Sequence, residues 1–151
     1  PCDRQNCNIF QPDNYNFKLM MNEQVSTIMI RDLQTVQPED SLQKVKELLI
    51  NHRIHHVPVV DKDFHLVGIL TTYDLFKLNV DHKDYLTTKV ANVMTRQLAT
   101  LEASDKVGTA AEVFMEHLFH ALPVLDGRKL IGIVTSFDVL RYAYNKEYPP
   151  R

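Results

Sequence analysis

The sequence predicts an α/β (α+β) fold built from two β-α-β-β-α repeats that pack sheet against sheet with pseudo-two-fold symmetry. The main observation is a tandem duplication, because residues 25–61 overlay residues 90–126 at a constant separation of 65 positions. The separation falls to 64 at a turn, beyond which residues 68–74 overlay residues 132–138. The second observation is the length of 151 residues. A copy of about sixty residues buries little core alone, so the two copies are expected to share one body with a cleft between them.

The first helix of each repeat is indicated by apolar residues at helical spacing. Residues 41–51 follow a stretch with two acidic residues and open on a cap-forming serine, which is typical of a helix start. A short strand that carries Thr35 or Thr100 is expected before each of these helices. The predicted apolar faces consist of Leu42, Val45, Leu48 and Leu49 in the first copy and of Val107, Ala110, Ala111, Phe114 and Met115 in the second.

A hairpin and a second helix complete each repeat. In the first copy, residues 57–60 and 66–70 are short β-branched runs around a turn, which predicts two buried strands. Residues 71–78 are then predicted to form a helix. Along the chain we expect an N-terminal extension over residues 1–22, a first repeat over 23–80, a linker over 81–88, a second repeat over 89–146 and a C-terminal tail over 147–151.

Composition excludes several classes of function. The formal net charge is -2 and the pI is about 6.4, so a nucleic-acid backbone would meet no net positive field. No apolar run is long enough to cross a membrane, and no signal peptide opens the chain, which favours a cytoplasmic protein. The two cysteines, Cys2 and Cys7, lie in the polar extension, where we expect reduced thiols and no metal site.

Three motifs occur twice, in the same order and at matched spacing. They are a Val-x-x-Ile/Val-Met opening, the strands Val-Pro-Val-Val-Asp and Leu-Pro-Val-Leu-Asp, and the segment Gly-Ile-Leu/Val-Thr-x-x-Asp. In these motifs, residues 22–146 resemble the tandem CBS-domain pair, often called a Bateman module. The resemblance implies a regulatory module that binds an adenosine-containing ligand, such as AMP, ADP, ATP, S-adenosylmethionine or cyclic di-AMP, in clefts between the repeats. It also implies a disc-shaped homodimer.

The Thr-x-x-Asp segments admit two interpretations. Thr71 and Asp74, like Thr135 and Asp138, have the spacing of a capping box, in which the threonine caps a helix and the acid favours its dipole. Alternatively, the carboxylate accepts both hydroxyls of a ribose, and the free N–H groups of the helix start face a phosphate. The resemblance implies the second role, with Asp holding the ribose and Thr lying toward the phosphate. Capping and binding can coexist.

A histidine cluster precedes the proline of each hairpin. The string Ile-His-His-Val-Pro-Val-Val-Asp is similar to a segment of the regulatory gamma subunit of AMP-activated protein kinase, which implies phosphate contacts for His55, His56 and His120. An anionic ligand would favour charged imidazoles, so affinity is expected to rise as the pH falls slightly. Ala121 replaces the second histidine in the second copy, which puts equal affinity of the two sites in doubt.

Two further groups have both a structural and a functional interpretation. Thr35 and Thr100 could face the adenine, as the resemblance implies, or could be ordinary strand residues. His52, His55 and His56 contain metal-ligating side chains, but the spacing lacks the glutamate of a helical zinc motif, so we expect no metal. His52 and His117 are more simply favourable partners for helix C-termini.

These observations predict a non-catalytic sensor of an adenine nucleotide, AMP or ATP above all, with no cofactor. A phosphate-cradling glycine loop, a nucleophile-base pair and a paired-acid motif are all absent, which argues against an enzyme. The expected partners are the adenosine-containing ligand, a second copy of the chain and an unknown regulated protein, without nucleic acid or membrane. The alternative is a dimerisation or protein-interaction module that binds no nucleotide. The predicted ligand-binding residues are Thr35, His55, His56, Thr71, Asp74, Thr100, His120, Thr135 and Asp138.

Overall fold

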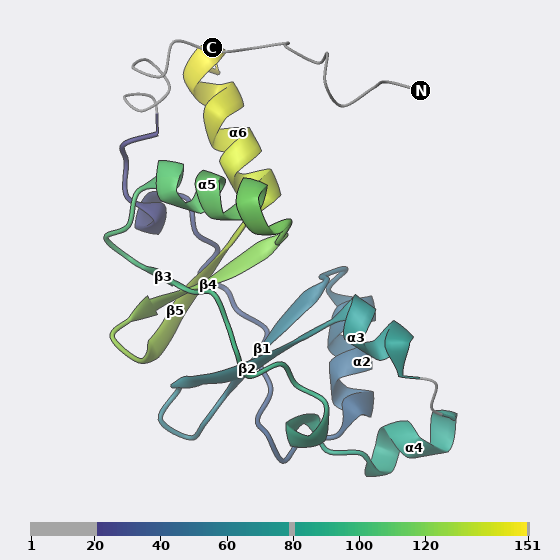
Figure 1. Cartoon of the computed structure of the whole chain (residues 1–151). Coiled ribbons are helices and arrows are strands. Elements are labelled where there is room, and N and C mark those ends of the chain that lie inside the picture. Colours follow the sequence, from purple (N-terminus) through teal and green to yellow (C-terminus); the bar gives the residue numbers. More distant parts are fainter. Residues whose placement is uncertain (1–20, 79–80, 151) are drawn as a thin grey trace, which may run out of the picture.

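The computed structural model describes residues 21–78 and 81–150, which form two lobes, one for each repeat (Figure 1). The predicted extension, apart from residues 21 and 22, lies outside the described residues, as do Cys2 and Cys7. The elements of the first repeat are η1 (Val25–Thr27), α2 (Leu42–Asn51), β1 (His56–Val60), β2 (Leu66–Thr71), α3 (Thr72–Lys77) and α4 (His82–Thr87). Those of the second are η2 (Val90–Asn92), β3 (Leu101–Glu102), α5 (Val107–His117), β4 (Ala121–Asp126), β5 (Lys129–Thr135) and α6 (Ser136–Glu147).

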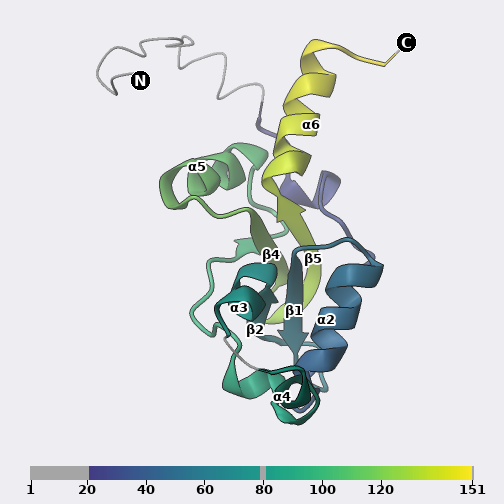
Figure 2. The same ribbon diagram turned by 90° about the vertical axis from the view of Figure 1, so that its right-hand side faces the viewer.

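The hairpins lie toward the middle of the molecule, and the longer helices lie outside them (Figures 1 and 2). Strands β1 and β2 pair antiparallel, and the second sheet has the order β3-β4-β5, with β3 parallel to β4. The predicted mixed fold of two similar halves is confirmed. Helix α4 occupies most of the segment that was predicted as a linker. No helix within residues 21–78 and 81–150 is long and apolar enough to span a bilayer.

The opening strand of each repeat is shorter than predicted. In the first repeat, Val36 forms a single parallel bridge to Val59, and in the second repeat β3 has only two residues. An acidic side chain explains this, because the N–H of Gln37 donates to Asp40 Oδ2 at 2.7 Å and no longer faces the sheet. The N–H of Glu102 makes the equivalent bond at 2.8 Å. Each acid therefore turns the chain out of the strand toward the next helix.

The two hydrophobic cores exchange their opening segments. Val25 and Met29, which precede the first repeat's sheet, are buried in the core of the second repeat. Val90 and Met94, which precede the second repeat's sheet, are buried in the core of the first. Each core is therefore completed by a segment that the duplication assigns to the other copy.

Backbone hydrogen bonds hold the exchanged segments in place. The N–H of Ile30 donates to the carbonyl of Ile133 at 2.8 Å, and the reverse bond measures 3.0 Å. Ile69 and Thr95 make the equivalent pair, with both bonds at 3.0 Å. Each hairpin thereby gains an edge from the opening segment of the other repeat, which brings residues of both repeats to the waist of the molecule.

Glycine is required where each exchanged segment crosses a hairpin. A Cβ atom on Gly68 would lie 2.6 Å from the sulfur of Met94, and one on Gly132 would lie 2.5 Å from the sulfur of Met29. Such distances are well inside van der Waals contact. The two repeated glycines therefore permit the close approach of a methionine of each exchanged segment.

Candidate functional site

Two cavities lie between the repeats at pseudo-equivalent positions. The first cavity has a volume of about 510 Å³, and the second has a volume of about 200 Å³. The first cavity is lined by residues 30, 32–34, 53–56, 58, 120, 133 and 135–137. The second cavity is lined by residues 56, 69, 71, 74, 95, 97–99 and 119–123. Each combines an opening segment and a hairpin start from one repeat with the end of a strand from the other.

The threonines and aspartates of both copies form complete capping boxes. Asp74 Oδ2 accepts the N–H of Thr71 at 2.8 Å and its hydroxyl at 2.7 Å, while the N–H of Asp74 donates to Thr71 Oγ1 at 3.2 Å. Thr135 and Asp138 repeat these bonds at 2.8, 2.6 and 3.2 Å. The capping interpretation is therefore confirmed for both pairs, and it occupies one carboxylate oxygen of each aspartate.

The other carboxylate oxygen, Oδ1, distinguishes Asp74 from Asp138. Asp138 is buried, with 6% of its surface exposed, and its Oδ1 accepts a bond from Arg141 at 3.3 Å. Asp74 has no such partner within the described part of the chain, although the equivalent residue, Lys77, lies over the ring of Tyr73 much as Arg141 lies over the ring of Phe137. Asp74 lines the second cavity, whereas Asp138 does not line the first. Of the two aspartates, Asp74 alone lines one of these two cavities with a carboxylate oxygen that the capping box leaves over, and the ribose contacts of Asp74 and Asp138 stay predictions.

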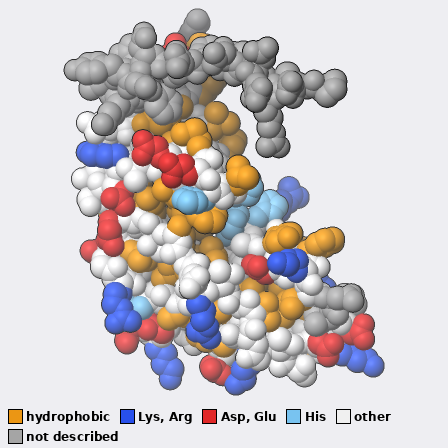
Figure 3. All heavy atoms as spheres, viewed as in Figure 1, with side chains coloured by type: hydrophobic (Ala, Val, Ile, Leu, Met, Phe, Trp, Pro, Cys, Tyr) orange, Lys and Arg blue, Asp and Glu red, His pale blue; other side chains and the backbone are white. Residues whose placement is uncertain are grey.

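The three predicted histidines come together at the waist. His56 and His120 line both cavities, and His55 lines the first. In Figure 3, histidine atoms gather beside a hollow in the surface. Burial lowers the pKa of His56 from 6.5 to about 4, with the nearby His55 and His120 lowering it further and Asp74 opposing them. His56 is therefore neutral at pH 7 in the free protein and can either donate or accept a hydrogen bond.

The two remaining predicted site residues lie outside both cavities. Thr35 is half-buried and Thr100 is exposed, and each immediately precedes the short strand rather than lying within it. The residues of the opening segments that do line the cavities are 30 and 32–34 in the first repeat and 95 and 97–99 in the second. These positions were not predicted from the sequence. The signal that could have indicated them is that the two sets of residues lie 65 positions apart, as the two repeats do.

The histidines considered as metal ligands do not form a cluster. Within residues 21–78 and 81–150, the only grouping of three suitable side chains is Asp61, Asp63 and His65, in the turn between β1 and β2. The N–H groups of Asp63 and His65 donate to Asp61 Oδ1, and His65 Nδ1 lies 3.1 Å from Asp61 Oδ2. These bonds account for the geometry of the three side chains. His52 follows α2 and His117 ends α5, the positions that a helix-dipole role requires.

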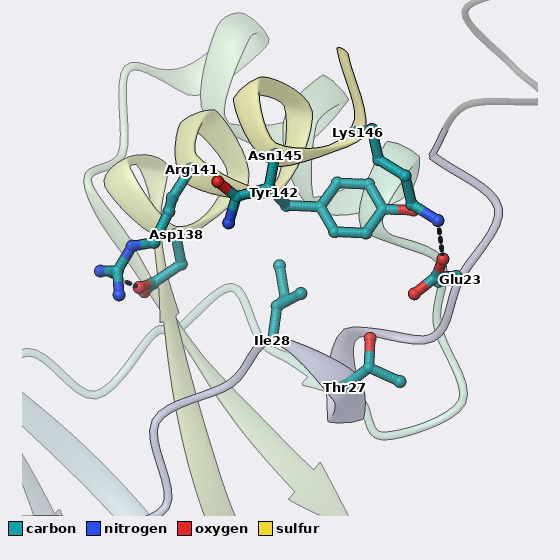
Figure 4. Close-up of a pocket in the computed structure, with 8 residues that line it drawn as sticks. All are labelled: Glu23, Thr27, Ile28, Asp138, Arg141, Tyr142, Asn145 and Lys146. Atoms are coloured by element: carbon teal, nitrogen blue, oxygen red, sulfur yellow. Dashed lines mark hydrogen bonds and ion pairs between the residues drawn. The ribbon is translucent and has the colours of Figure 1, made fainter. Parts of the chain in front are cut away.

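A third cavity, of about 490 Å³, lies between α6 and the exchanged segment that contains η1 (Figure 4). One end carries the ion pair of Glu23 with Lys146, and the other carries Asp138 with Arg141. Thr27, Ile28, Tyr142 and Asn145 line the space between the two pairs. This cavity was not predicted from the sequence, because the duplication gives no reason to bring residue 23 to the last helix.

The chain belongs to the CBS-domain family. The family model for the CBS domain matches residues 25–81 and again residues 90–145, so the pair is in tandem. This agrees with the duplication, with the two similar lobes and with the cavities between them. The family identified from the three repeated motifs is thereby confirmed.

Known proteins of similar sequence or structure include both long enzymes and isolated pairs. A homoserine O-acetyltransferase of Methanocorpusculum labreanum is 31% identical over 134 residues, which are 84% of this chain but only 26% of that protein. The chain thus spans about a quarter of that relative. The structure of CBSX2 in complex with AMP is similar at a TM-score of 0.74 and 30% identity, covering 82% of this chain and 98% of that one.

A second solved structure carries two different adenosine compounds. It is the CBS-domain pair of protein MJ0100 in complex with 5'-methylthioadenosine and S-adenosyl-L-methionine. It is similar to this chain at a TM-score of 0.69 and 30% identity, covering 80% of this chain and 94% of that one.

Proposed function

We propose that this chain is a non-catalytic regulatory module that binds an adenosine-containing ligand in the cavities between its repeats. The observation that carries the proposal is the pair of pseudo-equivalent cavities, each lined by both repeats and by the threonine of a capping box. Because both repeats contribute to each cavity, a bound ligand favours one arrangement of the repeats over others. That change is the signal that a regulated protein would read.

The chemistry of the lining supports an adenine nucleotide, with AMP or ATP preferred over S-adenosylmethionine and cyclic di-AMP. Ile54 and Phe119 offer apolar surface to a base at equivalent positions. The free oxygen of Asp74 can accept a ribose hydroxyl, and the imidazoles of His56 and His120 can donate to a phosphate. The AMP bound to CBSX2 and the adenosine compounds bound to MJ0100 support the same ligand class.

Isothermal titration calorimetry with AMP, ADP, ATP, S-adenosylmethionine and cyclic di-AMP tests this function. We expect at least one of them to bind, and Asp74→Ala to weaken binding in the second cavity about tenfold or more, since a hydrogen bond to a charged group contributes roughly 1.5–3 kcal/mol. Asp84→Ala is the matched control, because Asp84 is also an acid in the first turn of a six-residue helix but lies outside the cavities. A panel without binding, in protein freed of carried-over nucleotide, would contradict the proposal.

We also propose that the chain forms a homodimer through α3 and α6. Exposed apolar side chains occupy equivalent positions on these helices: Tyr73 and Phe137 are 63% and 62% exposed, and Phe76 and Leu140 are 86% and 64% exposed. A repeated apolar surface on both halves suits a self-complementary two-fold contact. This contact is also what the alternative function, a ligand-free interaction module, would use.

Light scattering coupled to size-exclusion chromatography tests the dimer. Phe76→Glu and Leu140→Glu place charges on this surface and should convert a dimer to a monomer. Ile50→Glu, at an exposed apolar residue of α2, is the control that should leave the mass unchanged. A wild-type protein that is monomeric at tens of micromolar concentration would rule out this dimer.

A further inference from the structure

The two cavities share a wall that consists of two histidines. His56 and His120 line both cavities, and a wider hollow of about 580 Å³ opens onto the same two side chains. The adjoining loops are fixed to the helix starts, since the N–H of Ser136 donates to the carbonyl of His120 at 3.1 Å. A phosphate held by these imidazoles from one cavity therefore occupies the place that a phosphate from the other would need. Two such anions at close range also repel each other.

The first cavity adds cationic and donor groups of its own. Its lining includes Arg53 and His55 beside the shared histidines, and the planar guanidinium of arginine matches a phosphate in geometry and charge. Asp32 is the one acid among its described lining residues. Asp138 does not line this cavity, and its Oδ1, the oxygen outside the capping box, accepts a bond from Arg141. The first cavity is therefore suited to an anionic ligand.

The second cavity lacks those groups. The residues 65 positions after Arg53 and His56 are Leu118 and Ala121, so its own hairpin contributes only His120 to phosphate binding. It also contains Asp74, whose unpaired oxygen repels a phosphate but accepts a hydroxyl. No lysine or arginine occurs among its described lining residues.

Volume alone does not separate the two cavities. The second cavity, at about 200 Å³, is less than half the volume of the first, at about 510 Å³. Pockets for small molecules usually span roughly 300–1,000 Å³. The first cavity alone has room for a base, a ribose and phosphates. The second reaches that range together with the adjoining hollow of about 580 Å³, which is lined by residues 55, 56, 71–73 and 118–120 and has no lysine or arginine among its described lining residues.

We propose that the two cavities take different ligands: the first binds a phosphorylated adenine nucleotide, and the second binds an adenosine compound without phosphate. Each chain then holds one phosphorylated nucleotide at a time. The proposal rests on the proposed function, since it divides two ligand classes between the two cavities described above. The protein would thereby respond to the ratio of two adenosine compounds rather than to the level of one.

Calorimetric titration of the full chain with AMP and with adenosine tests this division. We expect AMP to bind at one site per chain and adenosine to bind at one further site when added to AMP-saturated protein. Two equal AMP sites, or no adenosine binding to the AMP-saturated protein, would overturn the division and leave the proposed function standing. Binding of neither AMP nor adenosine, nor of any other adenosine compound in the panel, would overturn both.

A variant assigns the AMP site to the first cavity. Arg53→Leu copies the residue of the second repeat, and both positions share a left-handed backbone, with φ of 52° at Arg53 and 54° at Leu118. AMP affinity should fall about tenfold or more through loss of a charged hydrogen bond, while adenosine binding to the second cavity stays within about twofold. Arg128→Leu, at an exposed turn outside both cavities, is the matched control and should change neither. Equal loss of AMP in both variants, or unchanged AMP affinity in Arg53→Leu, would refute the assignment.

Discussion

Acidification should destabilise this protein through His56 in particular. The pKa of His56 is about 4 in the folded chain, against 6.5 for the ordinary group, because the side chain is buried beside two other imidazoles. Above pH 6.5 the side chain is neutral in both the folded and unfolded states, so its contribution is constant. Between pH 6.5 and 4 His56 is mostly protonated in the unfolded chain but mostly neutral in the folded chain. The free energy of unfolding therefore falls as the pH falls.

The size of this effect follows from the two pKa values. With pKa values of about 4 and 6.5, proton linkage lowers the free energy of unfolding by about 2 kcal/mol between pH 7 and pH 5. For a chain of this length, that corresponds to a fall of about 4–8 °C in Tm. Other groups titrate in the same range, so the contribution of His56 must be isolated with a variant.

Urea unfolding followed by circular dichroism at pH 7 and pH 5 provides the comparison. His56→Gln keeps a polar side chain that does not titrate, so its stability should fall by about 2 kcal/mol less than that of the wild type over this interval. Asn51→Gln, at the exposed residue that ends α2, is the control and should retain the wild-type pH dependence. If His56→Gln loses as much stability as the wild type, then burial does not hold His56 in its neutral form, and the reasoning fails.

Three other predictions concern the packing, the caps and the ligand. Gly68→Ala should destabilise the chain by about 1–3 kcal/mol in urea unfolding. In a chain that also carries Met94→Ala, the same glycine substitution should cost less. If the effects of the two substitutions simply add, the close contact between Gly68 and Met94 is contradicted. Thr135→Ala removes the hydroxyl that caps α6 and should cost about 1 kcal/mol, seen as a Tm lowered by about 2–4 °C; an unchanged Tm would mean that the box contributes nothing. A bound phosphate should raise the pKa of His56, so AMP should bind more tightly at pH 5.5 than at pH 7; calorimetry in buffers of different ionisation enthalpy would detect the proton uptake, and its absence would exclude His56 from the phosphate contact.

The sequence predicted those elements for which each copy could check the other. The hairpins, the helices before and after them and the two capping boxes follow from local spacing, and local spacing is what a duplication preserves. The exchange of opening segments was not predicted, because Val25 and Val90 are apolar in either copy and nothing in the pattern says which core they enter. Helix α4 was missed since it occurs once and has no counterpart to reveal it.

The candidate site was predicted in part for a similar reason. His56 and His120 lie just before the proline of a hairpin, in a pattern that occurs in both repeats, so their placement followed from it. The inequality of Asp74 and Asp138 did not, because it depends on where Arg141 and Lys77 direct their charges in three dimensions. Thr35 and Thr100 were selected one position too near the strand, while the cavities are lined by the residues just before them.

The exchange of the opening segments has a consequence for how the chain could be divided. A cut between the repeats would leave a first fragment that carries Val25 and Met29 without the core they fill, and that lacks Val90 and Met94 to close its own. Neither fragment would be a complete folding unit. Mixed together, the two fragments should reassemble by complementation, because each supplies the opening segment that completes the core of the other. The covalent join between the halves is then less important to the architecture than the mutual insertion of their leading residues.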